Sequence, residues 1–411
     1  MTPSVIVIGG GFGGLAVARG LQDRARVTLV SDQNFLLFTP MLAEVAAGDL
    51  DPRHISTPVR QLASNARVVA GSVVAVDPAT RKVRVARGFG LDSIELTADA
   101  IVLAMGSVPA TFGVAGVDEW ALSFKSIGDA LRIRNRILGL LESATEESDR
   151  DLTHVAVVGA GYSGAELAAA LADLLGSASR RYFTSAPKPA VTLVDFVDRV
   201  TPSLSKRLSA LAERALTHRG VDLVLGEKVE RVSGNGLELE SGRRVSAKTV
   251  VWAAGVRPHP LASEMGLPTD RGRLVVDSRM QVAPGIFALG DLALVPDGRG
   301  GFSPPTAQFA LRQGRYLGRY LPQILAGGRA PDFKYRTMGE LVSLGHRNAV
   351  GKVLGIPVSG FIGWFLFRSY YLFQLPTLMR KARVAIDWTL DLLFPPDVAW
   401  LPSSDVGPDV R

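Results

Sequence analysis

Cysteine is missing from the 411-residue sequence. The chain therefore has no disulfide bond, no thiolate ligand for a metal and no cysteine-based redox relay, and we predict no metal site. Long hydrophobic runs are missing as well. The longest apolar stretch, residues 353–367, contains Pro357 and is followed at once by Arg368. A transmembrane helix needs about 20 apolar residues, so we expect no membrane span.

Signals for export and for nucleic-acid binding are also missing. The chain reaches an apolar segment by Val5, which leaves no room for a signal peptide, so none is expected. The net charge of +7 suits an anionic membrane surface, an acidic cofactor or a nucleic acid. Zinc-finger spacing and aromatic-plus-basic RNA motifs do not occur, so we expect no nucleic-acid partner. The length fits two domains plus an appendage better than one core.

The first glycine-rich segment, VIVIGGGFGG, opens the chain with G-x-G-x-x-G spacing. We predict strands over residues 4–8 and 26–30 and a helix over 15–21 around it, which together make a βαβ unit. Glycines in its first turn let the backbone approach a pyrophosphate, and the helix N-terminus offers N–H groups to the phosphates. The residues predicted to bind the nucleotide are Gly9, Gly11, Phe12, Gly13 and Gly14.

A second segment, VAVVGAGYSGAE, repeats this pattern about 150 residues later. We predict strands over residues 154–158 and 191–195 and a helix over 165–175. The residues expected to bind a second nucleotide here are Gly159, Gly161, Tyr162, Ser163 and Gly164. Two such units predict an enzyme that uses two nucleotide cofactors.

The residues at the ends of the second strands bear on cofactor choice. Asp195 suits a hydrogen bond to a ribose 2′-hydroxyl and repels a 2′-phosphate, which favours NADH over NADPH, although Arg199 lies nearby and softens the choice. The matching strand end in the first unit is Ser31, followed by Asp32. Either can hydrogen-bond a ribose, and Asp32 is alternatively a solvated turn residue.

Three further hydrophobic strands end in small-residue turns, within residues 100–109, 249–260 and 285–291. Asp291, after the last of them, is placed to bind a sugar-like chain or to cap the following helix. The candidate cofactor residues in these turns are Ala104, Gly106, Ala254, Gly255, Gly290 and Asp291.

The N-terminal segment, the central G-x-G-x-x-G-x-E segment and the late Gly-Asp pair resemble the two-dinucleotide-binding flavoproteins. Disulfide reductases and sulfide:quinone oxidoreductases of that superfamily need cysteines, so this sequence excludes both. What remains is similar to the type II NADH dehydrogenases (NADH:quinone oxidoreductases) over nearly the whole chain, with Phe35 and Leu36 departing from the family pattern. The matching stretches are NFLLFTPMLAEVAAGDL (34–50), FKSIGDALRIRNRIL (124–138), PPTAQFALRQG (304–314) and FKYRTMGELVSLGHRNAVG (333–351).

This resemblance implies an α/β fold with two Rossmann-like dinucleotide-binding domains, one for FAD and one for NADH. It implies a discontinuous FAD domain over residues 1–115 and 256–330, with Asp291 on the ribityl chain, and an NADH domain over 116–255. Residues 331–411 would form a C-terminal amphipathic helical region that attaches to the membrane or dimerises. The implied reaction passes a hydride from NADH to FAD and two electrons to a quinone, menaquinone or ubiquinone, without proton pumping.

The resemblance also assigns residues near the reacting groups. Ala307, Gln308 and Gln313 form its A-Q-x₄-Q motif, which lines the quinone approach to the flavin, and Ala307 and Gln308 would also contact FAD. Glu166 would orient NADH and relay protons. Judged alone, the two glutamines read as solvated residues and Glu166 as a helix N-terminal acid favoured by the dipole.

Two further residues have open roles at this stage. Lys125 either stabilises negative charge that develops during the reaction or is a surface lysine, since lysine is usually exposed. His346 has no other histidine near it in the sequence. We expect it to be structural.

The segment over 360–394 is rich in aromatic and aliphatic residues and too interrupted to span a bilayer. It suits interfacial helices whose basic residues Arg368, Arg380, Lys381 and Arg383 meet anionic lipid. A self-burying hairpin and a dimer interface are the alternatives. We expect a homodimer attached peripherally to the cytoplasmic face of the cell membrane.

Two other functions stay open. One is a related reductase that uses NADPH or a specialised quinone. The other is a redox-regulated binding protein that resembles apoptosis-inducing flavoproteins and holds FAD as a structural group.

Overall fold

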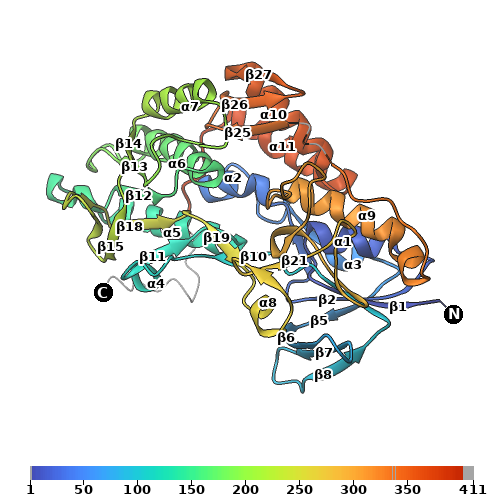
Figure 1. Ribbon diagram of the computed structural model, residues 1–411. Coiled ribbons are helices and arrows are strands. Elements are labelled where there is room, and N and C mark those ends of the chain that lie inside the picture. The colour runs from blue at the N-terminus through green and yellow to red at the C-terminus, as the bar shows by residue number, and fades with distance from the viewer. Residues whose placement is uncertain (1, 336, 338, 401–411) are drawn as a thin grey trace. The chain divides into compact units, whose positions relative to one another are not determined.

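The computed structural model describes residues 2–335, 337 and 339–400 (Figure 1). Its contacts divide the chain into two compact units, which are described separately. The first unit comprises Met1–Leu37, Ser56–Val108 and Val256–Thr337, and the second comprises Phe38–Ile55, Pro109–Gly255 and Met338–Arg411.

The first unit is organised around a six-stranded sheet that is parallel except for one edge strand. Short, β-branched and continuously apolar sequences such as SVIVI form its central strands, because both faces of the sheet are covered. In order across the sheet, the strands are β22 (Gln281–Ala283), β23 (Ile286–Ala288), β9 (Ala100–Leu103), β1 (Ser4–Ile8), β2 (Arg26–Ser31) and β5 (Arg67–Ala70).

Helices α1 (Phe12–Gly20) and α9 (Ala307–Leu325) pack against each other at very short range. A Cβ on Gly314 would lie 2.3 Å from the Gly13 carbonyl oxygen, and one on Gly318 would lie 2.8 Å from Gly20 Cα. Only glycine permits such backbone contact. The glycines of both helices therefore fix α9 beside the first glycine-rich loop.

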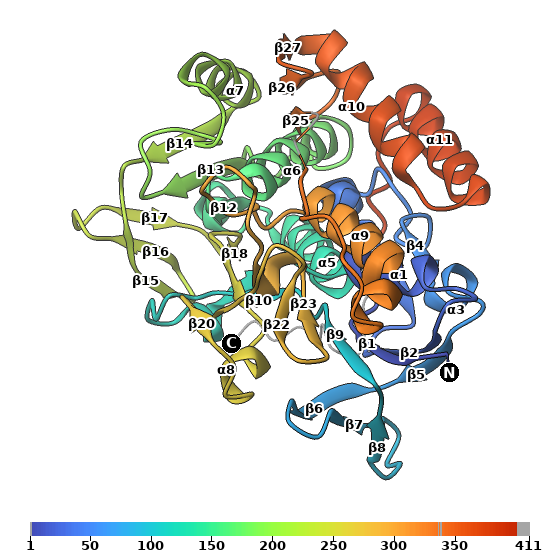
Figure 2. The same ribbon diagram turned by 45° about the vertical axis from the view of Figure 1, so that its right-hand side comes forward.

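The other elements of the first unit are short. A three-stranded sheet, β6–β8, follows β5 along the chain and lies at the bottom of Figure 2. The remaining elements are β3 (Phe35–Leu37), β4 (Ser56–Pro58), α3 (Val59–Leu62), β6 (Ser72–Asp77), β7 (Lys82–Ala86), β8 (Ile94–Thr97), β10 (Ser107–Pro109), β19 (Val256–Pro258), α8 (Leu261–Glu264), β20 (Thr269–Asp270), β21 (Arg273–Val275), η3 (Gly290–Leu292) and β24 (Ala293–Leu294).

The second unit contains a five-stranded parallel sheet. Its order is β11 (Ala121–Ser123), β18 (Thr249–Trp252), β12 (His154–Val158), β13 (Ala190–Asp195) and β14 (Val221–Leu225). Two parallel sheets, each with a glycine-rich turn after its central strand, confirm the predicted α/β fold with two Rossmann-like halves.

The start of one helix in the second unit accounts for the K-S-x-x-D-A pattern of the sequence. Helix α5 (Ile127–Ser143) begins with a capping box in which the Ser126 side chain accepts from Asp129 N–H and the Asp129 carboxylate accepts from Ser126 N–H. The Lys125 N–H also donates to Asp129, at 3.0 Å. The K-S-x-x-D-A pattern therefore specifies a helix start.

The other elements of the second unit are η1 (Thr39–Met41), α2 (Leu42–Ala47), α4 (Val117–Trp120), η2 (Glu147–Asp151), α6 (Tyr162–Arg181), α7 (Lys206–His218), β15 (Val229–Ser233), β16 (Gly236–Leu239), β17 (Arg244–Ser246), β25 (Gly339–Ser343), β26 (Ala349–Val353), β27 (Ile356–Ser359), α10 (Gly360–Gln374) and α11 (Leu378–Leu393).

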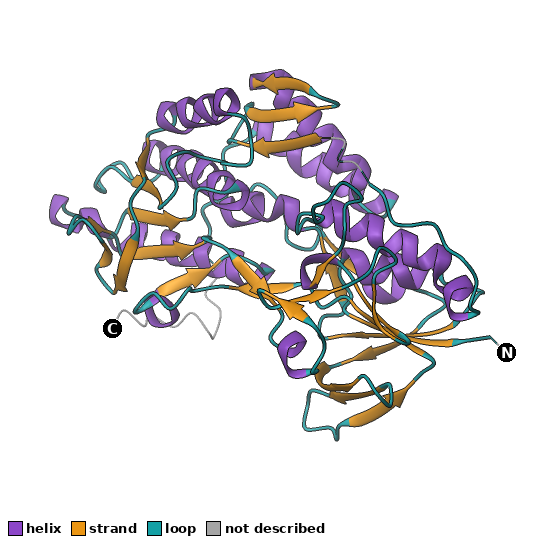
Figure 3. Cartoon of the chain, viewed as in Figure 1, coloured by secondary structure: helices purple, strands orange, loops and turns teal. Residues whose placement is uncertain are grey.

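The C-terminal part of the second unit is a three-stranded antiparallel sheet, β25–β27, followed by helices α10 and α11 (Figure 3). Helix α10 packs on β26, where Trp364 and Phe367 bury against Ala349. Among the described residues, none of the helices has both the length and the apolar character needed to cross a bilayer.

The two compact units do not coincide with the domain boundaries predicted from the sequence. The segment Phe38–Ile55 groups with the second unit because its helix α2 packs on α5 and α6, where Ala43 and Ala47 bury against Ala170 and Leu174. Of the predicted region 331–411, residues 331–335, 337 and 339–400 are described, and residues 336, 338 and 401–411 lie outside the described part.

Candidate functional site

The two glycine-rich loops have nearly the same geometry. Gly9 has φ +111° and Gly159 has φ +112°, in the region that glycine adopts without strain. A Cβ on Gly14 would lie 1.9 Å from the Gly9 oxygen, and one on Gly164 would lie 1.8 Å from the Gly159 oxygen. Each loop is therefore so tight that its first and last glycines cannot be replaced, as the predicted fingerprints require.

The turns predicted from the neighbouring strands border these loops. A Cβ on Gly9 would lie 2.3 Å from the Ala104 oxygen, and one on Gly159 would lie 2.6 Å from Ala254 Cα. Gly106 and Gly255 also have positive φ angles, +68° and +153°. The structure thus places Ala104 beside the first loop and Ala254 beside the second.

The middle glycine of each loop faces open space. Gly11 and Gly161 are the N-cap residues of α1 and α6, neither has a capping side chain, and a Cβ on either would have no neighbour within 4 Å. The first N–H groups of a helix have no partner inside the helix. Both loops therefore present backbone N–H groups and a helix dipole to a free volume, which fits the pyrophosphate of a dinucleotide.

The strand-end residues differ between the two loops. Asp195 is half-buried and its carboxylate accepts from the N–H groups of Ala160 and Val197, which ties it to the second glycine loop. Ser31 is buried and donates its hydroxyl to the Gln33 carbonyl, whereas Asp32 is exposed. At these two strand ends, the second unit thus has a carboxylate hydrogen-bonded to its loop, whereas the first has a buried serine followed by an exposed aspartate.

The Gly-Asp turn of the first unit is held from two sides. Asp291 accepts from the Ser107 hydroxyl at 2.6 Å. Gln313, which is 1% exposed, accepts from the Gly290 N–H at 2.8 Å. Gln313 therefore fastens the turn that carries Asp291, and its side chain is enclosed between α9 and that turn.

The other residues of the A-Q-x₄-Q motif lie at the start of α9. Gln308 is half-buried and accepts from the Thr337 hydroxyl at 2.9 Å, and Ala307 is the first helical residue. In the second unit, the Tyr162 hydroxyl donates to Glu340 at 2.6 Å. Burial, together with this hydrogen bond, raises the pKa of Tyr162. Ser163 is exposed.

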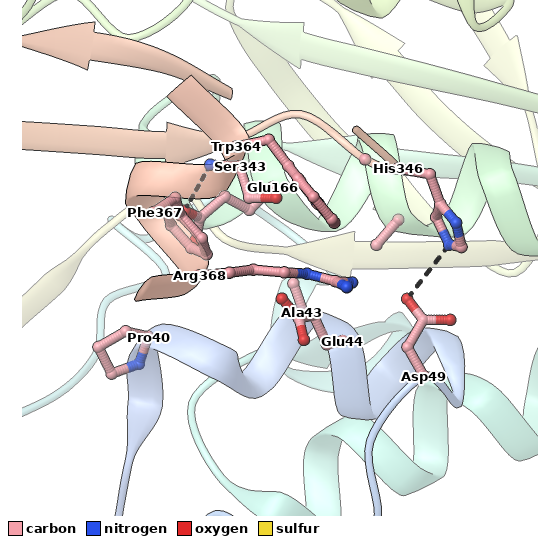
Figure 4. Close-up of a pocket in the computed structure, with 12 residues that line it drawn as sticks. Pro40, Ala43, Glu44, Asp49, Glu166, Ser343, His346, Trp364, Phe367 and Arg368 are labelled. Carbon is pink, nitrogen blue, oxygen red and sulfur yellow. Dashed lines mark hydrogen bonds and ion pairs between the residues drawn. The ribbon is translucent and has the colours of Figure 1, made fainter. Parts of the chain in front are cut away.

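Glu166 lies near the start of α6 and lines a cavity within the second unit (Figure 4). Its Oε1 accepts from the Ser343 N–H at 3.1 Å. The pKa of Glu166 is raised to about 8, because burial and the negative charge of Glu44 raise it more than the Ser343 hydrogen bond lowers it. The residues that line the cavity are Pro40, Ala43, Glu44, Asp49, Glu166, Ala170, Ser343, Gly345, His346, Trp364, Phe367 and Arg368.

His346 is not isolated in the fold. Its Nε2 lies 3.7 Å from Asp49 Oδ2 and 3.7 Å from Asp391 Oδ1. The hydrogen bond with Asp49 raises the pKa of His346 to about 9, so the imidazole is protonated at neutral pH. Three potential ligand atoms lie within 4.8 Å of one another here, but the guanidinium of Arg368 and the imidazolium already compensate the carboxylates. We assign no metal to this cluster.

The prediction that Arg368 meets anionic lipid is wrong. Its side chain is buried, pairs with Asp391 at 3.4 Å and lies 4.5 and 4.7 Å from the ring centroids of Trp364 and Trp388. Arginine is weakly hydrated and stacks well on aromatic rings. The contacts of Arg368 with these tryptophans depend on how α10 and α11 pack, and the spacing of residues in the sequence does not reveal that packing.

The cavity contains Glu44, which the sequence reasoning overlooked. Burial raises the pKa of Glu44 to about 7, and its Oε2 accepts from Trp388 Nε1 at 2.5 Å. Its only signal was an acid inside the otherwise apolar stretch MLAEVAAG, where a charged residue in a buried helix needs a reason.

Comparison with known proteins agrees with the geometry of the two glycine-rich loops. The pattern of the pyridine nucleotide-disulphide oxidoreductase family matches residues 3–314. A type II NADH:quinone oxidoreductase of Mycobacterium tuberculosis is 31% identical, over 95% of this chain and 88% of its own. An internal alternative NAD(P)H-ubiquinone oxidoreductase from the mitochondria of Solanum tuberosum is 28% identical, over 97% and 88%. NDH2 from Plasmodium falciparum, solved with NADH, shares the fold, with a TM-score of 0.90 at 18% identity over 97% of this chain and all of its own.

These matches and the two loops define the class as a pyridine-nucleotide flavoprotein. Within that class, the chain belongs to the type II NADH:quinone oxidoreductase family. Because the chain lacks cysteine, it cannot form the redox disulfide that gives the broader family its name.

Proposed function

We propose that this chain is an FAD-dependent enzyme that oxidises NADH and reduces a quinone. FAD, when bound, accepts the hydride of NADH and passes two electrons to the quinone. The observation that carries the proposal is the pair of matching glycine loops, each with an uncapped helix start that faces open space. Because the chain has no cysteine, the electrons of the reduced flavin must pass to an acceptor other than a protein thiol or disulfide.

The first unit supplies the residues proposed to hold FAD. The loop would bind the pyrophosphate, Ser31 or Asp32 the adenosine ribose, and Asp291 the ribityl chain. The proposed contacts are Gly9, Gly11, Phe12, Gly13, Gly14, Ser31, Asp32, Ala104, Gly106, Gly290, Asp291, Ala307 and Gln308.

The second unit supplies the residues proposed to hold NADH. Glu166 would lie near the nicotinamide, and Asp195 would bind the ribose. The proposed contacts are Gly159, Gly161, Tyr162, Ser163, Gly164, Glu166, Asp195, Ala254 and Gly255.

Asp195 is proposed to favour NADH, and Asp195→Asn tests this. The amide oxygen can still accept from a loop N–H, but the negative charge that repels a 2′-phosphate is gone. We expect the ratio of kcat/KM for NADPH to that for NADH to rise by about tenfold, the size of one charged hydrogen bond. Steady-state kinetics with both nucleotides measure it. An unchanged ratio would show that Asp195 does not set the preference.

Glu166 is proposed to hold and deliver a proton. A carboxyl group with a pKa near 8 keeps its proton at neutral pH, and quinol formation consumes protons. We expect Glu166→Gln to lower kcat on the order of 100-fold, as loss of a general acid does, with FAD still bound. Turnover at the wild-type rate would remove Glu166 from the mechanism.

Gln308 is the residue proposed to hydrogen-bond the quinone. Gln313 would act indirectly, through the Gly290–Asp291 turn that it holds in place.

The function itself is tested by mixing purified protein with NADH or NADPH and then with a soluble ubiquinone or menaquinone analogue. We expect NADH to bleach the flavin absorption and a quinone to restore it. Bleaching by NADPH alone would favour the NADPH-dependent alternative. Failure of every quinone to restore the absorption would favour a regulatory flavoprotein and contradict the proposal.

Helices α10 and α11 are proposed to attach the protein to a membrane surface. Leu378 is 82% exposed, Phe373 74% and Phe365 58%, and large apolar side chains exposed together on two consecutive helices indicate an interaction site. Arg383 is exposed, and the Lys381 ammonium lies over the Phe373 ring, so basic groups border the apolar residues, as in interfacial helices. A peripheral position on the cytoplasmic face of the cell membrane, and a homodimer, belong to the same proposal.

A further inference from the structure

Glu44 is an inward-facing carboxyl group to which the proposed function gives no task. It lies on α2 and lines the same cavity as Glu166 of α6. The Arg368 side chain extends across the cavity between the two glutamates (Figure 4). Within the described part of the chain, the ion pairs formed by Arg368 and His346 are with aspartates, and neither glutamate takes part in one.

The contacts of Glu44 hold it in place without compensating its charge fully. Its Oε2 accepts from Trp388 Nε1 at 2.5 Å. The nearest cation, Arg368, is paired with Asp391 at 3.4 Å and packed against Trp364 and Trp388. Because Arg368 already serves Asp391, Glu44 has one neutral hydrogen-bond donor and only a share of one positive charge.

Both glutamates are therefore poised to carry a proton near neutral pH. Burial raises the pKa of Glu44 to about 7 and that of Glu166 to about 8. The negative charge of an ionised Glu44 contributes to the raised pKa of Glu166. Two carboxyl groups in one cavity, of which one disfavours the ionisation of the other, keep a proton between them.

The cavity has a polar side that leads to solvent. His346 and Asp49 line it together with the glutamates, and the His346 side chain is 40% exposed while that of Asp49 is 10% exposed. The imidazolium there can pass a proton inward, and the neutral imidazole that results then takes a proton from water at the surface. Other charged groups hold this side in place: Asp173 of α6 accepts from the His346 N–H and pairs with Arg219.

The remaining titratable neighbours do not offer a competing proton store. Arg134 of α5 acts electrostatically on Asp49. Tyr162 and Tyr371 have pKa values raised by burial, so both stay neutral hydroxyl groups. Asp391 has a raised pKa but is paired with Arg368.

We propose that Glu44 is the proton store that reloads Glu166 through this cavity. The O–H bond of the Glu44 carboxylic acid breaks, an O–H bond forms on the Glu166 carboxylate, and Glu44 regains a proton from solvent on the His346 side. Arg368 stabilises the Glu44 carboxylate during the interval. Glu44 acts only through Glu166, so it is a positioning residue for the reaction. This inference rests on the proposed function, because it supplies the proton that Glu166 delivers.

The test compares the FAD-loaded wild type with Glu44→Gln, Glu44→Asp and, as a matched control, Glu142→Gln on the exposed side of α5. We expect Glu44→Gln to lower kcat on the order of tenfold, the lower end of proton-transfer effects. The loss should be largest below about pH 7, where wild-type Glu44 holds its proton, and should shrink as the pH rises above about 7, and the solvent deuterium isotope effect should increase. KM for NADH and the flavin content should not change. Glu44→Asp should restore most of the rate.

A second measurement does not depend on turnover. The infrared carbonyl band of protonated carboxylic acids should weaken as the pH is raised, and Glu44→Gln should lose the component that titrates near pH 7.

The pH dependence of protein stability gives a third measurement. The pKa of Glu44 is raised from 4.5 to about 7, so its stabilising proton is fully held below pH 4.5 and lost as the pH rises through about 7. The thermal midpoint of Glu44→Gln should therefore decline less over this range than that of the Glu142→Gln control.

The outcomes separate the two proposals. Absence of any quinone reduction by the wild type would contradict the proposed function. Normal quinone reduction with a wild-type pH profile and isotope effect in Glu44→Gln would overturn the role of Glu44 alone. A Glu44→Asp variant as slow as Glu44→Gln would also overturn it, because the carboxyl group would then not be what matters.

Discussion

Gly11→Val is expected to give a folded protein that purifies without flavin. Gly11 has φ −79° and ψ −170°, an extended conformation that valine adopts readily, and a Cβ there meets no atom within 4 Å. Replacing a glycine N-cap with valine costs about 1 kcal/mol, which a domain of this size tolerates. The added methyl groups fill the volume that a pyrophosphate would take, so the ratio of flavin absorption to protein absorption should fall close to zero.

Gly161→Val is the matched change in the second loop, with φ −70° and ψ −171° and again no neighbour within 4 Å. It should keep the flavin and lose NADH binding, so that NADH no longer bleaches the flavin while a chemical reductant still does. The pair thus separates the two nucleotides within one chain.

Gly14→Val serves as the contrasting variant, because its Cβ would lie 1.9 Å from the Gly9 oxygen. It should destabilise the protein, as seen by circular dichroism on heating, where Gly11→Val should not. A Gly11→Val protein that keeps its flavin at the wild-type ratio would show that the first loop does not bind FAD. The flavin content of the milder Gly11→Ala variant should lie between that of the wild type and that of Gly11→Val.

The sequence predicted the two βαβ units because their signals are local. Strands over 4–8 and 154–158 are confirmed as β1 and β12. The helices after them begin earlier than predicted, at Phe12 and Tyr162, because the helical conformation starts at the residue that follows the middle glycine. The apolar periodicity that marks a helix becomes visible only one turn later.

The cavity of Glu166 could not be predicted in the same way. Its walls come from four segments that lie far apart in the sequence, around Glu44, Glu166, His346 and Arg368. The raised pKa values of Glu44 and Glu166 result from burial that only the packing of α2, α6 and α10 produces. Glu166 was predicted because it adjoins a motif, whereas Glu44 has no such neighbour.

The same limit applies to the basic residues of α10 and α11. An arginine in an aromatic stretch reads as a lipid contact, and that reading failed for Arg368, which is buried. Arg380 donates to the Arg53 carbonyl at 2.6 Å. Arg383 is the exposed basic residue of this group. Which face of a short helix is covered depends on its partners, and in α10 apolar residues occur on every side of the helix.

The triple variant Phe365→Ser, Leu378→Ser, Ile386→Ser is expected to lose binding to lipid vesicles. The three side chains are 58%, 82% and 57% exposed, so serine should disturb little inside the protein. Burial of each in the acyl boundary contributes about 1.5–3 kcal/mol. Removing all three should weaken binding to vesicles that contain anionic lipid at least about 100-fold. Flotation of the purified protein with vesicles measures it, and flavin content and quinone reduction in detergent should be unchanged.

A matched control removes a similar apolar surface elsewhere. Val74, Phe89 and Leu91 of the first unit are 44%, 105% and 55% exposed, and their replacement by serine should leave vesicle binding intact. If both triple variants float equally well, helices α10 and α11 are not the anchor. If the α10–α11 variant keeps vesicle binding but changes from dimer to monomer in sedimentation, the apolar face joins two copies of the chain, because its side chains are then buried by protein rather than by lipid.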